Sequence, residues 1–146
     1  MRKSTVSILS ILCLFAGLAL SAGTAVAQNP NLHPIVTLTP ASLFFSVRAG
    51  QSATATAMLN NHSGVTLNIS KIEINETCAT TSDCGTQFHV VSHGCGAALK
   101  NGDSCAINVE FAPAAVVETA HASLKVTFSG VSAAQTKRVA LTGESR

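Results

Sequence analysis

The sequence contains no tryptophan and no tyrosine, so its six phenylalanines are its only aromatic side chains. Charged residues are also scarce, at 11% of the 146 residues. Without tryptophan and tyrosine, the aromatic hallmarks of antibody domains are excluded. Any hydrophobic core must therefore be mainly aliphatic, and its expected bulky members are Phe45, Phe88, Phe111 and Phe128.

The few charges nearly cancel. Two of the nine Lys and Arg residues, Arg2 and Lys3, lie within the first 27 residues, which leaves 9 − 2 = 7 cations against seven Asp and Glu. A near-neutral chain with scattered charges lacks the electrostatic footprint that nucleic acid or an anionic membrane surface attracts. We therefore expect neither of these as a partner.

The first 27 residues have the features of a secretory signal peptide. Arg2 and Lys3 precede an apolar run at 6–20, and small residues follow, ending in Ala25-Val26-Ala27. This order matches the basic, apolar and A-x-A regions of a cleavable signal. The alternative is an N-terminal membrane anchor that is retained. The apolar run argues against it, because it is shorter than the roughly 20 residues that a membrane helix needs.

Cleavage after Ala27 leaves 146 − 27 = 119 residues, a length typical of a single domain. The polar segment 28–34 contains two prolines and is expected to be a flexible lead-in. The domain itself is expected to span 35–146. We predict an exported protein, periplasmic or extracellular, that is not an integral membrane protein once the signal is removed.

Beyond the signal, the chain has four cysteines: Cys78, Cys84, Cys95 and Cys105. An even number in a small exported domain indicates disulfide bonds. Three pairings are possible, and we favour Cys95–Cys105 with Cys78–Cys84 because each bond closes a short segment. The alternative, a structural metal site, typically uses tight Cys-x2-4-Cys pairs, whereas these cysteines are separated by five, ten and nine residues. We therefore expect no metal and no other cofactor.

From residue 35 onward, apolar residues alternate with period two. The runs 43–47 and 105–111 show this most clearly, as strands with one buried face require. A slip at Ser70-Lys71 indicates a β-bulge or two short strands. We expect 112–122 to form a loop and Gly143 to end the last strand. Seven to eight short strands without helical periodicity predict an all-β protein, a single immunoglobulin-like antiparallel β-sandwich.

A set of motif residues is concentrated in the second half of the chain. Its members are Phe88, Cys95, Gly96, Leu99, Gly102, Ser104, Cys105, Val109, Phe111 and Pro113. Further matches are Pro40, Leu43, Phe45, Val47 and Gly50 near the start and Ala140 to Gly143 near the end. Through these residues, the stretch 39–143 resembles the bacterial form of the ASH domain, named after abnormal spindle and hydin and related to major sperm protein. Bacterial members are often labelled choice-of-anchor D. The resemblance implies an immunoglobulin-like fold and a non-catalytic role, and it implies no particular ligand.

The sequence departs from this family pattern in two places. Val117-Glu118 stands where a glycine turn is common, and the loop between Cys78 and Cys84 is additional. We expect partner contacts at the loop 77–86 and at the turn 60–64. The candidate contact residues are Thr77, Asp83, Thr86, Asn61 and His62.

No motif points to catalysis, so we expect no enzyme. His62, His89, His93 and His121 lie in no recognisable nucleophile motif, and the acidic residues are too scattered to suggest a two-carboxylate glycosidase. The predicted function is a binding or adhesion-type module for a protein or cell-envelope partner. The alternatives are a self-associating structural envelope component and a chaperone-like strand-binding protein. The small alternating residues at 52–57 fit either an edge strand open to a peptide or a thin strand packed on its neighbour.

Overall fold

The computed structural model describes residues 35–76 and 87–146, which form nine strands. The strands are β1 (Ile35–Thr39), β2 (Ser42–Val47), β3 (Ala53–His62), β4 (Leu67–Glu76), β5 (Phe88–His93), β6 (Ala98–Leu99), β7 (Ser104–Phe111), β8 (Val117–Ser129) and β9 (Gln135–Ser145). The predicted signal peptide, the lead-in and the cysteines at 78 and 84 lie outside the described residues. No helix within the described ranges has the length and apolarity that crossing a membrane requires.

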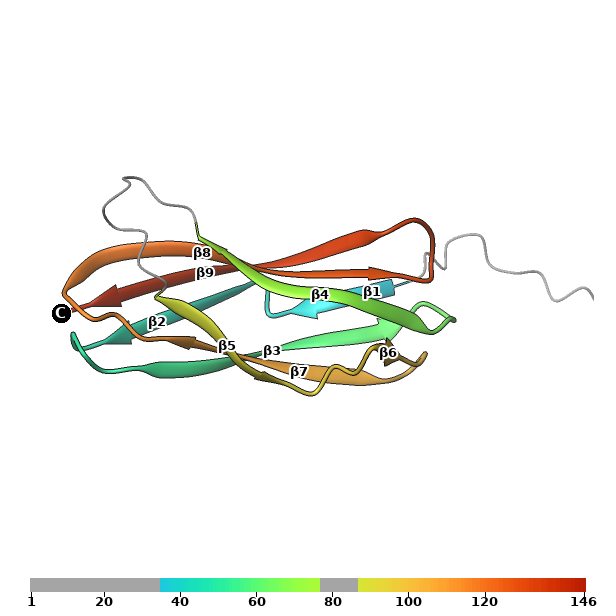
Figure 1. Cartoon of the computed structure of the whole chain (residues 1–146), viewed down its shortest axis with the longest axis horizontal. Coiled ribbons are helices and arrows are strands. Elements are labelled where there is room, and N and C mark those ends of the chain that lie inside the picture. The colour runs from blue at the N-terminus through green and yellow to red at the C-terminus, as the bar shows by residue number, and fades with distance from the viewer. Residues whose placement is uncertain (1–34, 77–86) are drawn as a thin grey trace, which may run out of the picture.

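The strands form two sheets that pack face to face (Figure 1). One sheet has the order β1-β3-β7-β5, and the other has the order β2-β9-β8-β4-β6. This arrangement confirms the predicted immunoglobulin-like sandwich. It differs from the prediction in two details: β2 pairs with β9 in parallel, and the two-residue β6 raises the strand count to nine.

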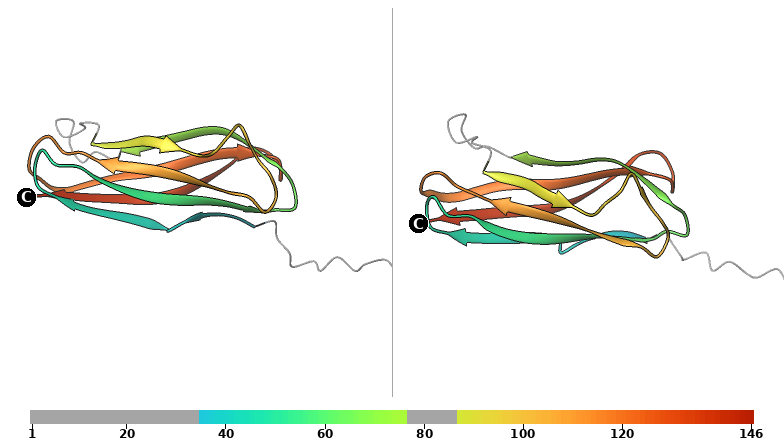
Figure 2. Two further views of the ribbon diagram at one scale, coloured as in Figure 1. Left: turned by 90° about the horizontal axis from the view of Figure 1, so that it is seen from below. Right: turned by 60° about the horizontal axis from the view of Figure 1, so that its bottom comes forward.

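The chain changes sheets at Pro40. β1 pairs with the end of β3 in the first sheet, whereas β2 pairs with β9 in the second. Proline has no backbone N–H and therefore cannot continue a hydrogen-bonded ladder, which explains why β1 ends before it. Figure 2 shows β1 and β2 following one another along one margin of the sandwich, next to β3.

The four expected phenylalanines are all in the core. Phe111 and Phe128 are fully buried, and Phe45 and Phe88 nearly so. Three of them form an aromatic cluster, in which the ring centroids of Phe88 and Phe111 are 4.8 Å apart and Phe45 lies within 6.0 Å of both. Apart from Cys95 and Cys105, the rest of the core is aliphatic, as the absence of tryptophan and tyrosine required.

Two expected boundaries are wrong. β8 begins at Val117, so only 112–116 remain outside strands where a loop over 112–122 was expected. β9 runs through Gly143 to Ser145, because Gly143 is a packing position opposite Phe111 and not a turn. The slip at Ser70-Lys71 is confirmed as a β-bulge within one continuous strand, β4.

Candidate functional site

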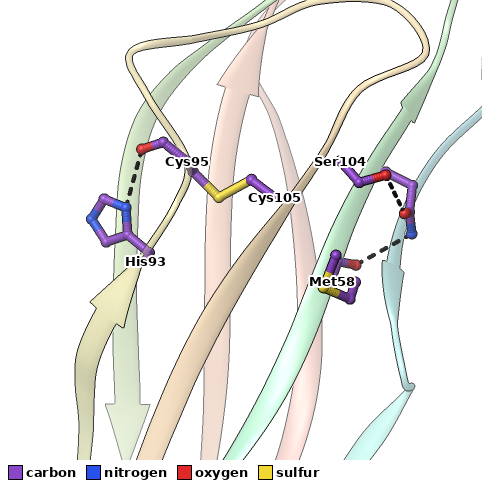
Figure 3. Close-up of a disulfide and its surroundings, with 6 residues drawn as sticks. Met58, His93, Cys95, Ser104 and Cys105 are labelled. Carbon is purple, nitrogen blue, oxygen red and sulfur yellow. Dashed lines mark hydrogen bonds between the residues drawn. A yellow bond between two sulfur atoms is a disulfide. The ribbon is translucent and has the colours of Figure 1, made fainter.

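The predicted Cys95–Cys105 disulfide is present, with the two Cα atoms 5.0 Å apart (Figure 3). Cys105 lies on the buried face of β7, and Cys95 lies in the segment that connects β5 to β6. Both cysteines are buried. The bond therefore fixes this connecting segment against the sandwich.

A shallow cleft of about 220 Å³ opens between this segment and the bulge of β4. Its lining residues are Ile69, Ser70, Lys71 and Ile72 from β4, and His93, Cys95, Gly96 and Ala97 from the end of β5 and the segment after it. The volume is below the roughly 300 Å³ at which pockets for drug-sized ligands begin. The shape suits a protruding side chain or a short extended peptide better than a small molecule enclosed on all sides.

Local hydrogen bonds hold both walls of the cleft. The Ser70 hydroxyl donates to the Thr127 carbonyl at 3.0 Å, which ties the bulge back to β8. Nδ1 of His93 lies 3.1 Å from the Cys95 carbonyl oxygen (Figure 3), and the Ile69 amide donates across the cleft to the Ala97 carbonyl at 2.9 Å. The site is therefore preformed.

A three-member charge network lies beside the cleft. The Lys71 ammonium is 2.6 Å from one Glu73 carboxylate oxygen, and the Lys125 ammonium is 3.2 Å from the other. The hydrogen bond from Lys71, followed by that from Lys125, lowers the pKa of Glu73 below its ordinary value of 4.5. With two cations to one anion, this part of the sheet carries a net positive charge.

The backbone of β4 is open along most of its outer edge. β6 pairs with only Leu67 and Asn68 of β4, and no other described strand pairs with that side of β4. An open strand edge offers backbone donors and acceptors to an added strand. The described chain has no group of three His, Cys, Asp or Glu side chains placed to hold a metal ion.

The prediction that Asn61 contacts a partner is wrong for its side chain. Asn61 is fully buried, and its amide donates to the carbonyls of Val65 at 2.8 Å and Leu99 at 2.9 Å. Its side-chain oxygen accepts from the amide and the hydroxyl of Ser63, at 3.0 and 2.6 Å. Asn61 therefore holds the turn together, whereas His62 beside it is exposed.

The other predicted contact residues, Thr77, Asp83 and Thr86, lie outside the described residues, as does the predicted Cys78–Cys84 bond. These positions fall in the sequence between the end of β4 and the start of β5. Sequence reasoning missed the cleft itself. The available signal was the slip at Ser70-Lys71, which predicted the bulge but was not linked to a site.

Both interpretations of the segment 52–57 are partly correct. Within β3, residues 53–57 pair with β7 along their whole length, so the segment does pack on a neighbour. β1 pairs only with Met58 to His62, which leaves 53–57 with no second partner among the described strands.

Neither a protein-family model nor a curated protein matches the sequence. Solved structures do match. The VesB protease of Vibrio cholerae aligns at a TM-score of 0.59 and 15% identity, over 75% of this chain and 32% of VesB. The ASH/PapD-like domain 7 of human CEP192 aligns at 0.54 and 14%, over 89% of this chain and 97% of the domain.

A third match comes from the CsuC–CsuE chaperone–tip adhesion subunit pre-assembly complex of Acinetobacter baumannii. Its TM-score is 0.52 at 12% identity, over 77% of this chain and 57% of the matched chain. This chain thus spans about a third of VesB and nearly the whole of the CEP192 domain. At these identities the likenesses show the fold alone, that of an immunoglobulin-like β-sandwich.

Proposed function

We propose that this protein is an exported, non-catalytic binding module that captures an extended segment of a protein partner along the open edge of β4. The observation that carries the proposal is the position of that edge directly beside the preformed cleft. Strand addition would supply backbone hydrogen bonds, and the cleft would accept a side chain of the added segment. Lys71 at the cleft favours a partner segment with an acidic residue nearby.

The non-catalytic part of the proposal rests on the sequence, in which the histidines lie in no recognisable nucleophile motif. Nδ1 of His93 lies against the Cys95 backbone carbonyl, a contact that orients the ring at the rim of the cleft. The assignment to the choice-of-anchor D family belongs to the same proposal and rests on the motif residues between Phe88 and Pro113.

Export and the second disulfide complete the proposal. The Cys95–Cys105 bond fits an oxidising compartment. The intact mass of the secreted protein should correspond to a chain that begins at Gln28. It should also lie about 4 Da below the mass of the reduced protein, because each of the two disulfides removes two hydrogen atoms. A mass that retains residues 1–27, or free thiols at Cys78 and Cys84, would contradict these two points.

A capture experiment with paired variants tests the binding site. The exported protein is used to capture partners from envelope and culture-supernatant fractions, which are then identified by mass spectrometry. Ala97→Trp fills the cleft, and Ala133→Trp places the same side chain at an exposed position in the connection between β8 and β9. The proposal expects a discrete partner that is lost with Ala97→Trp and retained with Ala133→Trp. Equal capture by both variants would contradict it.

The charge at the cleft gives a second paired test. Lys71→Glu reverses the charge beside the cleft, whereas Lys100→Glu changes another exposed lysine in the turn after β6. We expect weaker capture for Lys71→Glu alone. Capture by the wild type should weaken with added salt, and the variant should lose this salt dependence.

A chaperone-like strand-binding protein is the second candidate, favoured by the likeness to the CsuC–CsuE complex. It predicts capture of incompletely folded partners and no capture of the same partners once folded.

A further inference from the structure

β2 has an open sheet edge with an exposed aromatic side chain. It is the terminal strand of the five-stranded sheet, and β9 is its hydrogen-bonded neighbour in the sheet. The six residues of β2, Ser42 to Val47, include no charged residue and no proline, and their pairing with β9 shows no register shift. An uncharged edge of this kind, without a bulge or proline, is prone to pair with another strand.

The β4, β5 and β1 edges carry features that discourage indiscriminate pairing, whereas the half of β3 that β1 leaves open, 53–57, has only small alanine and threonine side chains. The β4 edge has the bulge at Ser70 and the charged residues Lys71 and Glu73. The β5 edge has a register shift between Val90 and Ser92. β1 is only five residues long. Bulges, charges and short lengths are the usual protections of edge strands, and β2 has none of the three.

The side chains of β2 divide cleanly between two faces. Leu43 and Phe45 are buried in the core, whereas Ser42, Phe44 and Ser46 are exposed on the outer face. Phe44 is 65% exposed, although phenylalanine is otherwise a core residue in this domain. An exposed phenylalanine on an open edge strand offers apolar surface that an added strand would cover.

The order of these residues is symmetric about Phe44. We propose that β2 pairs antiparallel with β2 of a second copy of this chain, with the two-fold axis at Phe44. Phe44 then lies opposite Phe44 of the second copy on the outer face, and Ser42 lies opposite Ser46. Leu43 lies opposite Phe45 on the inner face. A two-fold interface must be self-complementary, and the sequence Ser-Leu-Phe-Phe-Ser meets that requirement on both faces.

The register is fixed by the alternation of faces. Because the side-chain period of a strand is two, a slip of one residue would place Phe44 of one copy opposite the core-facing Phe45 or Leu43 of the other. The surroundings also permit the approach. In the proposed register the exposed Arg48 lies opposite Pro40, so no like charges meet. The half of β3 beside β2 carries only alanine and threonine at 53–57, which adds little bulk.

Cysteine pairs test the register directly. In the proposed dimer, residue 42 of one copy adjoins residue 46 of the other, whereas residues 42 of the two copies are about 13 Å apart along the strand. Ser42→Cys and Ser46→Cys are conservative changes that leave Phe44 in place. We expect an equimolar mixture of the two single variants to form a covalent 42–46 heterodimer on mild oxidation, with the linked peptides identified by mass spectrometry. Each single variant alone should give little cross-linked product.

Sedimentation velocity over a dilution series tests the association itself. The wild-type protein should shift from monomer to dimer as its concentration rises. Phe44→Lys places two cations against each other at the axis and should leave only monomer. Val116→Lys is the matched control, because Val116 is 67% exposed and lies outside β2. That variant should dimerise like the wild type.

Three results would overturn the proposal. The first is a wild-type protein that stays monomeric at every concentration. The second is equal loss of dimer in the Phe44→Lys and Val116→Lys variants. The third is cross-linking of each cysteine variant with itself as efficiently as in the mixture. A monomer that loses a different protein partner in the Phe44→Lys variant would assign the β2 edge to a heterologous strand instead. Circular dichroism on each variant separates loss of pairing from loss of folding.

Discussion

The ring of Phe111 packs so closely on the backbone of Gly143 that a Cβ at Gly143 would lie 2.5 Å from Cε2 of the ring. Phe111 ends β7 in one sheet, and Gly143 lies within β9 of the other. Phe111 also contacts Phe45 and Phe88, and these two rings contact each other. The missing side chain at Gly143 thus makes room for one ring of the aromatic cluster.

We predict that Gly143→Ala destabilises the domain. The added methyl group overlaps the Phe111 ring, and overpacking of this kind typically costs about 1–3 kcal/mol in the free energy of unfolding. Urea denaturation should show a lower midpoint with an unchanged slope. Gly94→Ala is the control, because a methyl group added at Gly94 would meet no atom within 4 Å beyond its chain neighbours and the φ of Gly94 is not positive. Its midpoint should stay close to that of the wild type.

A double-mutant cycle identifies the cause. Phe111→Leu removes the clashing ring edge, so Gly143→Ala should cost less in the Phe111→Leu background than in the wild type. Additive effects of the two changes would show that the Phe111 contact is not the reason for the destabilisation.

We also predict that Asn61→Ala is more disruptive than its place in a polar, turn-forming sequence suggests. Loss of the side chain leaves the Val65 and Leu99 carbonyls and the Ser63 amide without these partners. The Leu99 hydrogen bond is the buried one of the three, and leaving a buried polar group unsatisfied costs about 1–3 kcal/mol, so a loss of about 1–3 kcal/mol in thermal or urea unfolding is expected. His62→Ala, at the exposed neighbouring position, should change stability by less than about 0.5 kcal/mol. Similar losses for both variants would mean that the buried hydrogen bonds of Asn61 are not decisive.

The fold was predictable because each strand buries one face. Alternation located β2 and β7, and the four phenylalanines that occupy the core could be chosen from the sequence alone. The Cys95–Cys105 bond was predictable because it closes a short local segment. These features depend on neighbouring residues in the sequence or on a strict period.

The errors arose where long-range packing decides the outcome. Glycine usually interrupts strands, and only the position of the Phe111 ring makes Gly143 a strand residue. Asn61 lies in a turn-forming sequence that is exposed on average, and its burial depends on Leu99, 38 residues away. The cleft joins residues 69–72 to residues 93–97, so no local pattern could place it.

Removal of the Cys95–Cys105 bond by a Cys95→Ala/Cys105→Ala double substitution should lower the free energy of unfolding. The bond joins residues ten apart in the sequence and restricts the unfolded chain, which contributes about 3 kcal/mol to the free energy of unfolding in the chain-entropy model. Because Cys95 lines the cleft, amide hydrogen exchange in 94–97 should also accelerate. Amides in β9 provide the internal reference, and equal acceleration there would indicate a global effect in place of a local one.

The pH dependence of the charge network follows from the lowered pKa of Glu73. Because the folded-state pKa lies below the ordinary value of 4.5, the stabilising contribution of Glu73 is fully present above that pH and is lost as the pH falls through the folded-state value. The stability difference between wild type and Glu73→Gln should therefore shrink in acid.

Carbon-detected NMR titration of the Glu73 carboxyl measures the pKa directly. Lys71→Gln should raise it, because Lys71 donates the hydrogen bond that lowers it most, and Lys125→Gln should also raise it. Lys100→Gln, which changes a lysine outside the two ion pairs of Glu73, should leave the pKa of Glu73 unchanged. An unaltered Glu73 titration in the Lys71→Gln variant would show that the 2.6 Å ion pair does not form in solution.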